Sequence, residues 1–234
     1  MSVKAPLHIL SRLIEGLPSQ QRKRLLNACE PVDLVFGNIL HEAEEPIRHV
    51  YFPLSGFISL VTTLEGHQPL EMGLIGNEGM LGATLALGVA QAPMRAVVQG
   101  SGSALRISSG VFKQEMLSSP ALLRTLKRYL YVVTAQLSQS AACTHFHAIE
   151  PRLARWLLMT HDRAHADHFH LTHEFLADML GVRRSGVSIA AAVLQERGLI
   201  SYSRGEIYIL DRKGLEHASC ECYAALTADY NAQF

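Results

Sequence analysis

The stretch LTHEFLADMLGVRRSGVSIAAAVL, residues 171–194, decides the expected fold of the C-terminal region. Its first part carries apolar residues at helical spacing, namely Phe175, Leu176 and Leu180. Gly181 follows, and glycine readily adopts the positive φ angle that ends many helices. A second helix is expected to begin near Arg183, with an apolar face formed by Val187, Ala190, Ala191 and Leu194. Two helices joined by so short a turn are typical of the helix-turn-helix, whose second helix lies in the major groove of DNA.

A hairpin is expected directly after the second helix. Residues 198–203 and 206–210 read as two strands, and they turn at Arg204-Gly205, where the glycine tolerates a left-handed backbone. Such a hairpin would form the wing of a winged helix-turn-helix. Asp211 is expected to cap one final helix that continues through Leu215, Cys222 and Leu226.

The N-terminal half has a different character. Its first segment is expected to be helical, with an apolar side formed by Leu10, Leu13, Ile14, Leu17, Leu25 and Leu26. From residue 31 to 107 short β-like runs alternate with turns, and residues 96–99 and 104–107 are expected to flank a turn at residues 100–102. Short strands at such regular intervals, punctuated by glycine and proline, indicate an all-β sandwich or barrel.

A long helix is expected between the two halves, over residues 119–143. Its apolar positions recur at three- and four-residue steps, at Leu122, Leu126, Tyr129, Val133, Leu137 and Ser140. This seam matches a coiled-coil interface and predicts a dimer. The alternative is a single helix packed on its own domain. A further helix is expected at residues 152–161, followed by a polar, histidine-rich loop.

Composition narrows the class of protein. The 234 residues carry a formal net charge of zero, which argues against a protein that coats nucleic acid through a global basic field. The four cysteines show no paired spacing, no signal segment opens the chain, and no apolar run could span a bilayer. We therefore expect a reduced, cytoplasmic protein that is not associated with a membrane.

A β domain, a long helix and a winged helix in this order resemble the Crp/Fnr family of bacterial transcription regulators. The residues that carry the resemblance are VYFPLSGFIS at 50–59 and LADMLGVRRSGVS at 176–188. The resemblance implies an α+β fold with three parts: a β-roll (a cyclic-nucleotide-binding-like jelly roll) at 1–118, a dimerisation helix at 119–143, and a winged helix-turn-helix at 144–234. It also implies a homodimer bound to a two-fold operator in double-stranded DNA, and contact with RNA polymerase if the protein activates transcription.

The recognition helix departs from the family, many of whose members read bases with a Glu and two Arg. Arg184 occupies the first Arg position and can form a forked contact with guanine, whereas Ser185 replaces the Glu and Ile189 the second Arg. Gly186 is interpreted as allowing close approach to DNA or as a tolerated defect. The full predicted DNA-binding set is Arg183, Arg184, Ser185, Ser188, Ile189, Thr172 and Arg204. In this set Arg183 and Arg204 would contact phosphates, Ser185 and Ser188 would bond to a base edge or a phosphate, and Ile189 would touch a thymine methyl group. Thr172 would cap its helix or contact a phosphate.

The ligand motif of cyclic-nucleotide-binding relatives is not preserved. Their Gly-Glu-Leu turn corresponds to residues 82–85, which read Gly-Ala-Thr-Leu, and the Arg that follows is missing at residues 92–93. A buried phosphate needs a cation, and Arg95 is the only Lys or Arg between Arg48 and Arg106. Gly82 and Arg95 are therefore weak candidates for an effector site. We expect a different effector or none, and no cofactor.

No metal site is predicted. Only Cys29 lies in the N-terminal segment where some relatives hold an iron–sulfur cluster. Cys220 and Cys222, placed on one helix, would project about 200° apart and could not clamp an ion. The histidines at 161, 165, 168, 170 and 173 are expected to be solvated, although His161 and His165 have a chelating spacing.

The sequence thus predicts a sequence-specific transcription regulator rather than an enzyme, because no catalytic motif stands out. The alternative is a module that binds a cyclic nucleotide or another small molecule and uses its winged helix to contact protein. Salt dependence would discriminate between them, since DNA binding weakens steeply with ionic strength.

Overall fold

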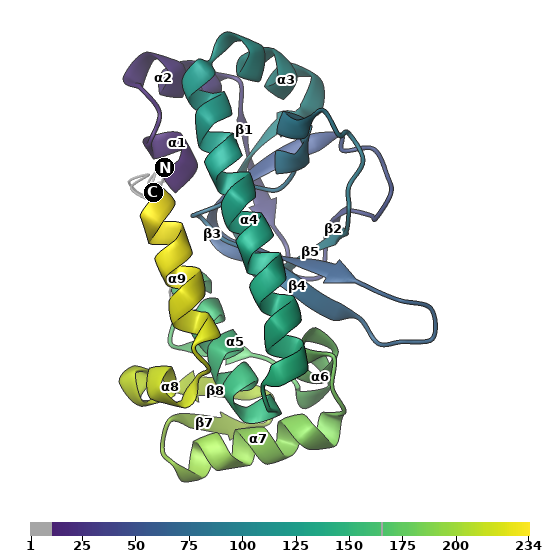
Figure 1. Cartoon of the computed structure of the whole chain (residues 1–234), viewed down its shortest axis with the longest axis vertical. Helices are drawn as coiled ribbons and strands as arrows, with labels where there is room; N and C mark the ends of the chain where they lie inside the picture. Colours follow the sequence, from purple (N-terminus) through teal and green to yellow (C-terminus); the bar gives the residue numbers. More distant parts are fainter. Residues whose placement is uncertain (1–10, 165) are drawn as a thin grey trace, which may run out of the picture.

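The computed structural model describes residues 11–164 and 166–234, and Figure 1 shows their arrangement. A β-roll and a helical domain lie at opposite ends of the molecule, and the helix α4 (Pro120–Phe146) runs between them. The predicted α+β organisation is confirmed. Leu10, which was assigned to the apolar side of the first helices, lies outside the described residues.

Within the described residues, five strands form the sheet of the roll: β1 (Glu30–Leu34), β2 (Ile39–His41), β3 (His49–Thr62), β4 (Leu70–Ile75) and β5 (Arg95–Ser108). All pairings are antiparallel in the order β1-β5-β3-β4, and β2 also pairs with β5. Helices α1 (Arg12–Glu15), α2 (Ser19–Asn27), the 3-10 helix η1 (Ala83–Leu87) and α3 (Ser109–Ser118) complete the roll. Leu13, Ile14 and Leu25 are buried in the same core as Phe52, so the N-terminal helices belong to this domain.

The expected turn at residues 100–102 is wrong, because these residues lie inside β5. The register between β3 and β5 shifts three times around Ser55 and Phe57, and the two strands continue past each other. Gly56 makes this possible. It has a φ of 71°, and a Cβ atom there would lie 2.2 Å from the carbonyl oxygen of Gly100. The small residues that suggested a turn instead allow two long strands to bulge in close contact.

Most of the apolar seam predicted for dimerisation packs inside its own chain. Leu122, Leu126 and Tyr129 are buried against the roll, and Val133 packs on the same core. Ser140 is also buried. The alternative of a helix packed on its own domain is therefore correct for this face, because the open roll needs a helix to cover its apolar side. Neither α4 nor any other helix in the described ranges combines the length and apolarity needed to span a bilayer.

The helical domain, which we call the reader (residues 149–218), follows α4 directly. It contains α5 (Ile149–Ala164), β6 (His168–His170), α6 (His173–Leu180), α7 (Arg184–Glu196), β7 (Ile200–Ser203), β8 (Glu206–Ile209) and α8 (Arg212–Ala218). Its core surrounds Trp156, and the four residues predicted for the apolar face of α7 are all buried in it. The wing is confirmed, with β7 and β8 joined at Arg204 and Gly205. Part of the expected histidine-rich loop is instead a third strand, β6, paired with β8.

The single final helix expected from the sequence is wrong. Asp211 caps α8 as predicted, since its side chain accepts from the amide of Gly214 at 2.9 Å, but α8 ends at Ala218. Ser219 is extended, and a separate helix α9 (Cys222–Gln233) starts after Cys220. Figure 1 shows α9 running back alongside α4. Cys220 consequently lies in the break between α8 and α9, and Cys222 is the first residue of α9, so the two cysteines do not share a helix.

Candidate nucleic-acid interface

Hydrogen bonds at both ends of α6 position the recognition helix α7, which follows it. The Thr172 hydroxyl accepts from the amide of Phe175 at 3.1 Å, which starts α6 as predicted. Gly181 ends α6 with a φ of 62°, and the guanidinium of buried Arg152 donates to the carbonyl of Leu180. With both ends of α6 satisfied, α7 begins three residues later at Arg184.

Six of the seven predicted DNA-binding residues have exposed side chains: Thr172, Arg183, Arg184, Ser185, Ile189 and Arg204. Arg184, Ser185 and Ile189 lie on the first turns of α7, and Ile189 is 68% exposed. Arg204 lies at the tip of the wing with a φ of 52°. An exposed Ile on the solvent side of a recognition helix offers an apolar contact of the kind that a thymine methyl group makes.

Ser188 differs from the other six because its hydroxyl is already engaged. It donates to the carbonyl of Arg184 at 3.1 Å and lies 2.8 Å from Nδ1 of His173. The His173 ring in turn stacks on Tyr202 of the wing, with centroids 4.2 Å apart. Sequence reasoning placed His173 among solvated histidines, but it is partly buried. Burial and the nearby Arg184 lower the pKa of His173. His173 thus connects α6, the recognition helix and the wing.

Gly186 is small for a reason other than contact with DNA. A Cβ atom at this position would lie 2.5 Å from Cδ1 of Ile149, at the start of α5. The missing side chain therefore makes room for packing inside the reader. The sequence did not indicate this packing reason, which lies in the contact of α5 with α7, and close approach of Gly186 to DNA stays a prediction.

The start of α7 lies beside the roll of the same chain. A groove of about 700 Å³ is lined by Arg183 and Arg184 on one side and by residues of the β3–β4 hairpin, such as Leu70, on the other. Gly181 lies against the Leu70 side chain. Glu174 approaches Arg184 at 3.9 Å, but both side chains are largely exposed, so this pair is weak and leaves Arg184 available.

A chain of polar groups crosses the buried junction between roll and reader. The Trp156 indole donates to one oxygen of Glu71 at 2.8 Å. The other Glu71 oxygen lies 2.6 Å from the Ser59 hydroxyl, which lies 2.5 Å from the Gln99 side-chain oxygen. The Gln99 amide then donates to the sulfur of Met179 on α6, at 2.9 Å. These contacts connect β3, β4 and β5 of the roll with α5 and α6 of the reader.

The protonation of Glu71 is set by this junction. Burial raises its pKa from 4.5 to about 7, against the lowering effect of its hydrogen bonds and of Arg155 and Arg163. A proton on Glu71 also explains how the Ser59 hydroxyl can lie close to two side-chain oxygen atoms. The Ser59 hydroxyl has one proton but two close oxygen neighbours, so a proton on Glu71 lets both contacts form. The partners of Glu71 come from segments that are distant in sequence, on β3 and α5.

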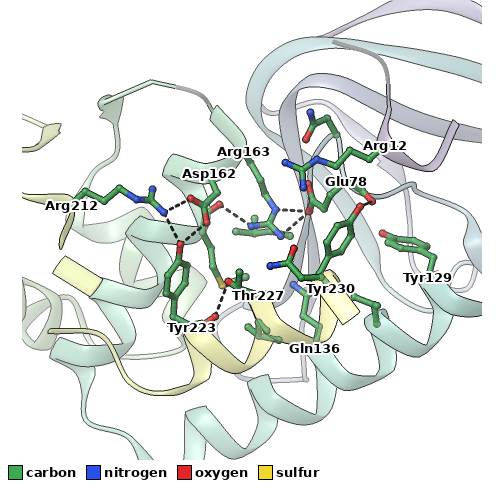
Figure 2. Close-up of a pocket in the computed structure, with 16 residues that line it drawn as sticks. Arg12, Glu78, Tyr129, Gln136, Asp162, Arg163, Arg212, Tyr223, Thr227 and Tyr230 are labelled. Atoms are coloured by element: carbon green, nitrogen blue, oxygen red, sulfur yellow. Dashed lines mark hydrogen bonds and ion pairs between the residues drawn. The ribbon is translucent and has the colours of Figure 1, made fainter. Parts of the chain in front are cut away.

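A second junction surrounds a cavity of about 380 Å³ between the roll, α4, α5 and α9 (Figure 2). Arg163 and Glu78 form an ion pair at 2.7 Å, and both side chains are mostly buried. Arg212 pairs with Asp162 at 2.7 Å and donates to the Tyr223 hydroxyl at the same distance. Arg12 also lines this cavity, so its three arginines outnumber its two carboxylates, Glu78 and Asp162, by one.

The weak effector candidates do not form a phosphate site. Arg95 has an exposed side chain that pairs with Glu42 at 2.8 Å. Gly82 precedes η1 and lies against Val50, and the neighbouring Ala83 and Leu85 point into the apolar core.

Three other histidines of the tract at residues 161–173 each have a partner within the chain. His161 lies 2.7 Å from Asp167, His170 lies 2.6 Å from Glu206, and His168 stacks on Tyr208. The possible chelating pair of His161 and His165 cannot be placed, because His165 lies outside the described residues.

Comparison with known proteins agrees with this architecture. Residues 32–119 match the family model described as a cyclic nucleotide-binding domain, and residues 151–218 match the Crp-like helix-turn-helix domain. The chain belongs to the Crp/Fnr family. As a Crp/Fnr protein it has the architecture of a transcription regulator. No curated protein matches its sequence.

Several solved structures share the fold. A putative Crp/Fnr transcriptional regulator from Eubacterium rectale is 18% identical, with a TM-score of 0.68 over 88% of this chain and 97% of that one. FixK2 from Bradyrhizobium japonicum is 15% identical, with a TM-score of 0.69 over 82% and 98%. A putative cyclic nucleotide binding protein from Ruegeria pomeroyi is 23% identical, with a TM-score of 0.60 over 93% and 98%.

Proposed function

We propose that this Crp/Fnr protein acts as a homodimer that binds a two-fold operator in double-stranded DNA. Each protomer inserts α7 into a major groove, and the two grooves lie about 34 Å apart. Arg184 contacts a guanine, Ser185 and Ile189 contact neighbouring base edges, and Arg183 and Arg204 bind phosphates. Thr172 acts chiefly as the helix cap, and Ser188 positions the helix through His173.

The observation that carries this proposal is the solvent exposure of Arg183 and Arg184 at the start of the recognition helix α7. Had these side chains been buried, the interpretation would have failed. Burying an unpaired arginine is costly, so these side chains remain in solvent and charged. Two adjacent guanidinium groups held by the start of a helix suit a polyanionic partner. The base-contacting residues differ from the Glu and two Arg common in the family, so we expect a different operator.

The dimer interface that we propose on α4 overlaps the expected seam only at Leu137. Leu123, Leu130 and Leu137 recur every seven residues and are only partly buried within the chain, although Leu130 also touches the core of the roll. Tyr131 lies beside this row and is 56% exposed. A heptad row of leucines on a helix that otherwise packs on the roll is suited to pair with its copy in a second chain.

The effector is not a cyclic nucleotide in this proposal, because Arg95, the only Lys or Arg between Arg48 and Arg106, has an exposed side chain that pairs with Glu42. A signal would instead reach the reader through the junction around Glu71 and shift the population between two orientations of the reader. We place the protein in the cytoplasm, where it would meet DNA. If it activates transcription, RNA polymerase is a further partner.

The experiment is to map binding sites across the genome of the source organism and measure affinity for the recovered operator. Arg184→Ala should weaken specific binding by about 1–3 kcal/mol and relax the preference at one base. Arg183→Ala should weaken binding to all sequences and reduce the salt slope by about one. The matched control is Arg48→Ala, since Arg48 is an exposed arginine of the roll. Equal affinity of all four proteins, or binding independent of salt, would contradict the proposal and favour a protein-adaptor role.

A further inference from the structure

Four side chains with metal-binding atoms converge where α4 ends and α9 begins. Cys143 and His147 come from the last turn of α4 and the residue after it, Cys220 from the break between α8 and α9, and Cys222 from the first turn of α9. Their three sulfur atoms and one imidazole nitrogen all lie within 4.8 Å of one another. Cys143 and Cys222 are fully buried, Cys220 is 6% exposed, and His147 is partly buried.

The spacing fits one tetrahedral ion. Sulfurs bonded to zinc at about 2.3 Å stand about 3.8 Å apart, and a sulfur and an imidazole nitrogen about 3.6 Å apart. The Cys143 and Cys220 sulfurs are separated by 3.6 Å, and the Cys222 sulfur lies 3.5 Å from Nδ1 of His147. A disulfide would require a sulfur–sulfur distance of about 2.05 Å and would use only two of the four groups.

Neighbouring groups complete the coordination chemistry. Nε2 of His147 donates to the Glu221 carboxylate at 3.1 Å, so in the neutral ring Nδ1 is the unprotonated nitrogen, and it lies 3.5 Å from the Cys222 sulfur. Carboxylate–histidine pairs of this kind orient metal-binding imidazoles. The Gln139 amide donates to the Cys222 sulfur at 3.0 Å, as amides do toward thiolates.

Two buried arginines supply charge compensation. Arg152 and Arg155 are 5% and 8% exposed, and neither forms an ion pair with a carboxylate in the described part of the chain. Each has a buried Nε without a hydrogen-bond partner among the described residues. Both interact electrostatically with Cys143. Unpaired buried cations are costly, and nearby thiolates would offset that cost.

We propose that Cys143, His147, Cys220 and Cys222 form a structural site for one Zn²⁺ ion. On binding, the three thiols release their protons to solvent, no group is oxidised or reduced, and the site carries a net charge of −1 beside the two arginines. This proposal departs from the sequence-based prediction of no metal site. That prediction assumed that Cys220 and Cys222 share a helix, but the helix break turns both sulfurs toward Cys143.

The position of the site indicates which elements a bound ion would hold together. It joins the end of α4, which we propose to be the dimer helix, to the segment that leads out of the reader into α9. The ligands come in two local pairs, Cys143 with His147 and Cys220 with Cys222, and the pairs are more than 70 residues apart in sequence. The ion would therefore cross-link two segments that otherwise meet through packing and through the contacts of His147 with Glu221 and of Gln139 with Cys222. Bound zinc should therefore stabilise the packing of α9 on α4.

The test is the metal content of the full-length chain purified under reducing conditions in metal-free buffers. We expect one zinc per chain by mass spectrometry of the metals, and near-zero zinc for Cys220→Ser. Cys29→Ser is the matched control and should keep its zinc, because Cys29 lies in the roll. The reduced chain freed of metal should bind one Co²⁺ with the visible spectrum of a tetrahedral thiolate complex.

A conservative variant keeps the test decisive if Cys220→Ser fails to fold. His147→Cys retains four ligands and should still bind one zinc, with a cobalt spectrum shifted toward that of four thiolates, whereas His147→Ala should bind zinc more weakly. A folded wild-type chain with no stoichiometric zinc and no tetrahedral cobalt spectrum would overturn the proposal. So would iron with inorganic sulfide in place of zinc, or equal zinc content in wild type and folded Cys220→Ser.

Discussion

Replacing Glu71 by Gln should remove a large part of the dependence of stability on pH. The buried carboxyl has a pKa of about 7 in the folded chain, against 4.5 as its ordinary value. The folded state therefore holds a proton between these two values that the unfolded state has released. Stability contributed by the neutral carboxyl is complete below about pH 4.5, is lost as pH rises toward 7, and stays lost above it.

The magnitude follows from the size of the shift. Each pKa unit corresponds to about 1.4 kcal/mol, so a shift of about 2.5 units gives roughly 3 kcal/mol. Most of this change, about 2–3 kcal/mol, should fall between about pH 5 and pH 8. Glutamine cannot ionise but keeps an oxygen for the Trp156 indole, so the variant should retain the junction at both pH values.

The assay is urea unfolding of wild type and Glu71→Gln, followed by tryptophan fluorescence, at about pH 5 and pH 8. The single tryptophan, Trp156, donates directly to Glu71 and reports on this junction. The free energy of unfolding of wild type relative to the variant should fall by about 2–3 kcal/mol on going to the higher pH. Exposed Glu65, in the β3–β4 hairpin, provides the control Glu65→Gln, which should follow wild type. A constant difference between wild type and Glu71→Gln at both pH values would refute the reasoning.

Three further substitutions test the reader and the roll separately. Thr172→Ala removes the acceptor at the start of α6 and should lower the free energy of unfolding by about 1 kcal/mol, whereas Thr172→Ser should retain most of it in the same urea assay. Gly186→Ala gains about 1 kcal/mol in helix propensity but crowds Cδ1 of Ile149. The change should therefore be better tolerated in an Ile149→Val background, and additive effects in a double-mutant cycle would contradict this steric account. Leu126→Ala creates a cavity under α4 and should cost about 2–5 kcal/mol, while Lys127→Ala on the exposed side should cost little; equal losses would show that α4 does not pack as described.

Local signals are sufficient for the helix-turn-helix and the wing. Thr172, Gly181 and the apolar spacing of α7 act over a few residues, and the helix boundaries, the cap and the buried face follow from backbone conformation and helical periodicity. The same is true of the turn at Arg204-Gly205, where two positive φ angles close a short hairpin. The exposure of Arg183 and Arg184 follows from this helix geometry, because the opposite face of α7 is fully apolar.

The remaining features depend on which segments meet, and a linear pattern does not contain that information. An apolar row on α4 looks the same whether a second chain or the roll covers it, so Leu122 and Leu126 were first assigned to a dimer interface. The contact of Gly186 with Ile149 and the burial that raises the pKa of Glu71 likewise depend on the tertiary structure. Cys143 and Cys220 are 77 residues apart, yet their sulfurs lie 3.6 Å from each other. Capping and periodicity are local properties of the chain, whereas burial, charge environment and ligand geometry arise from contacts between distant segments.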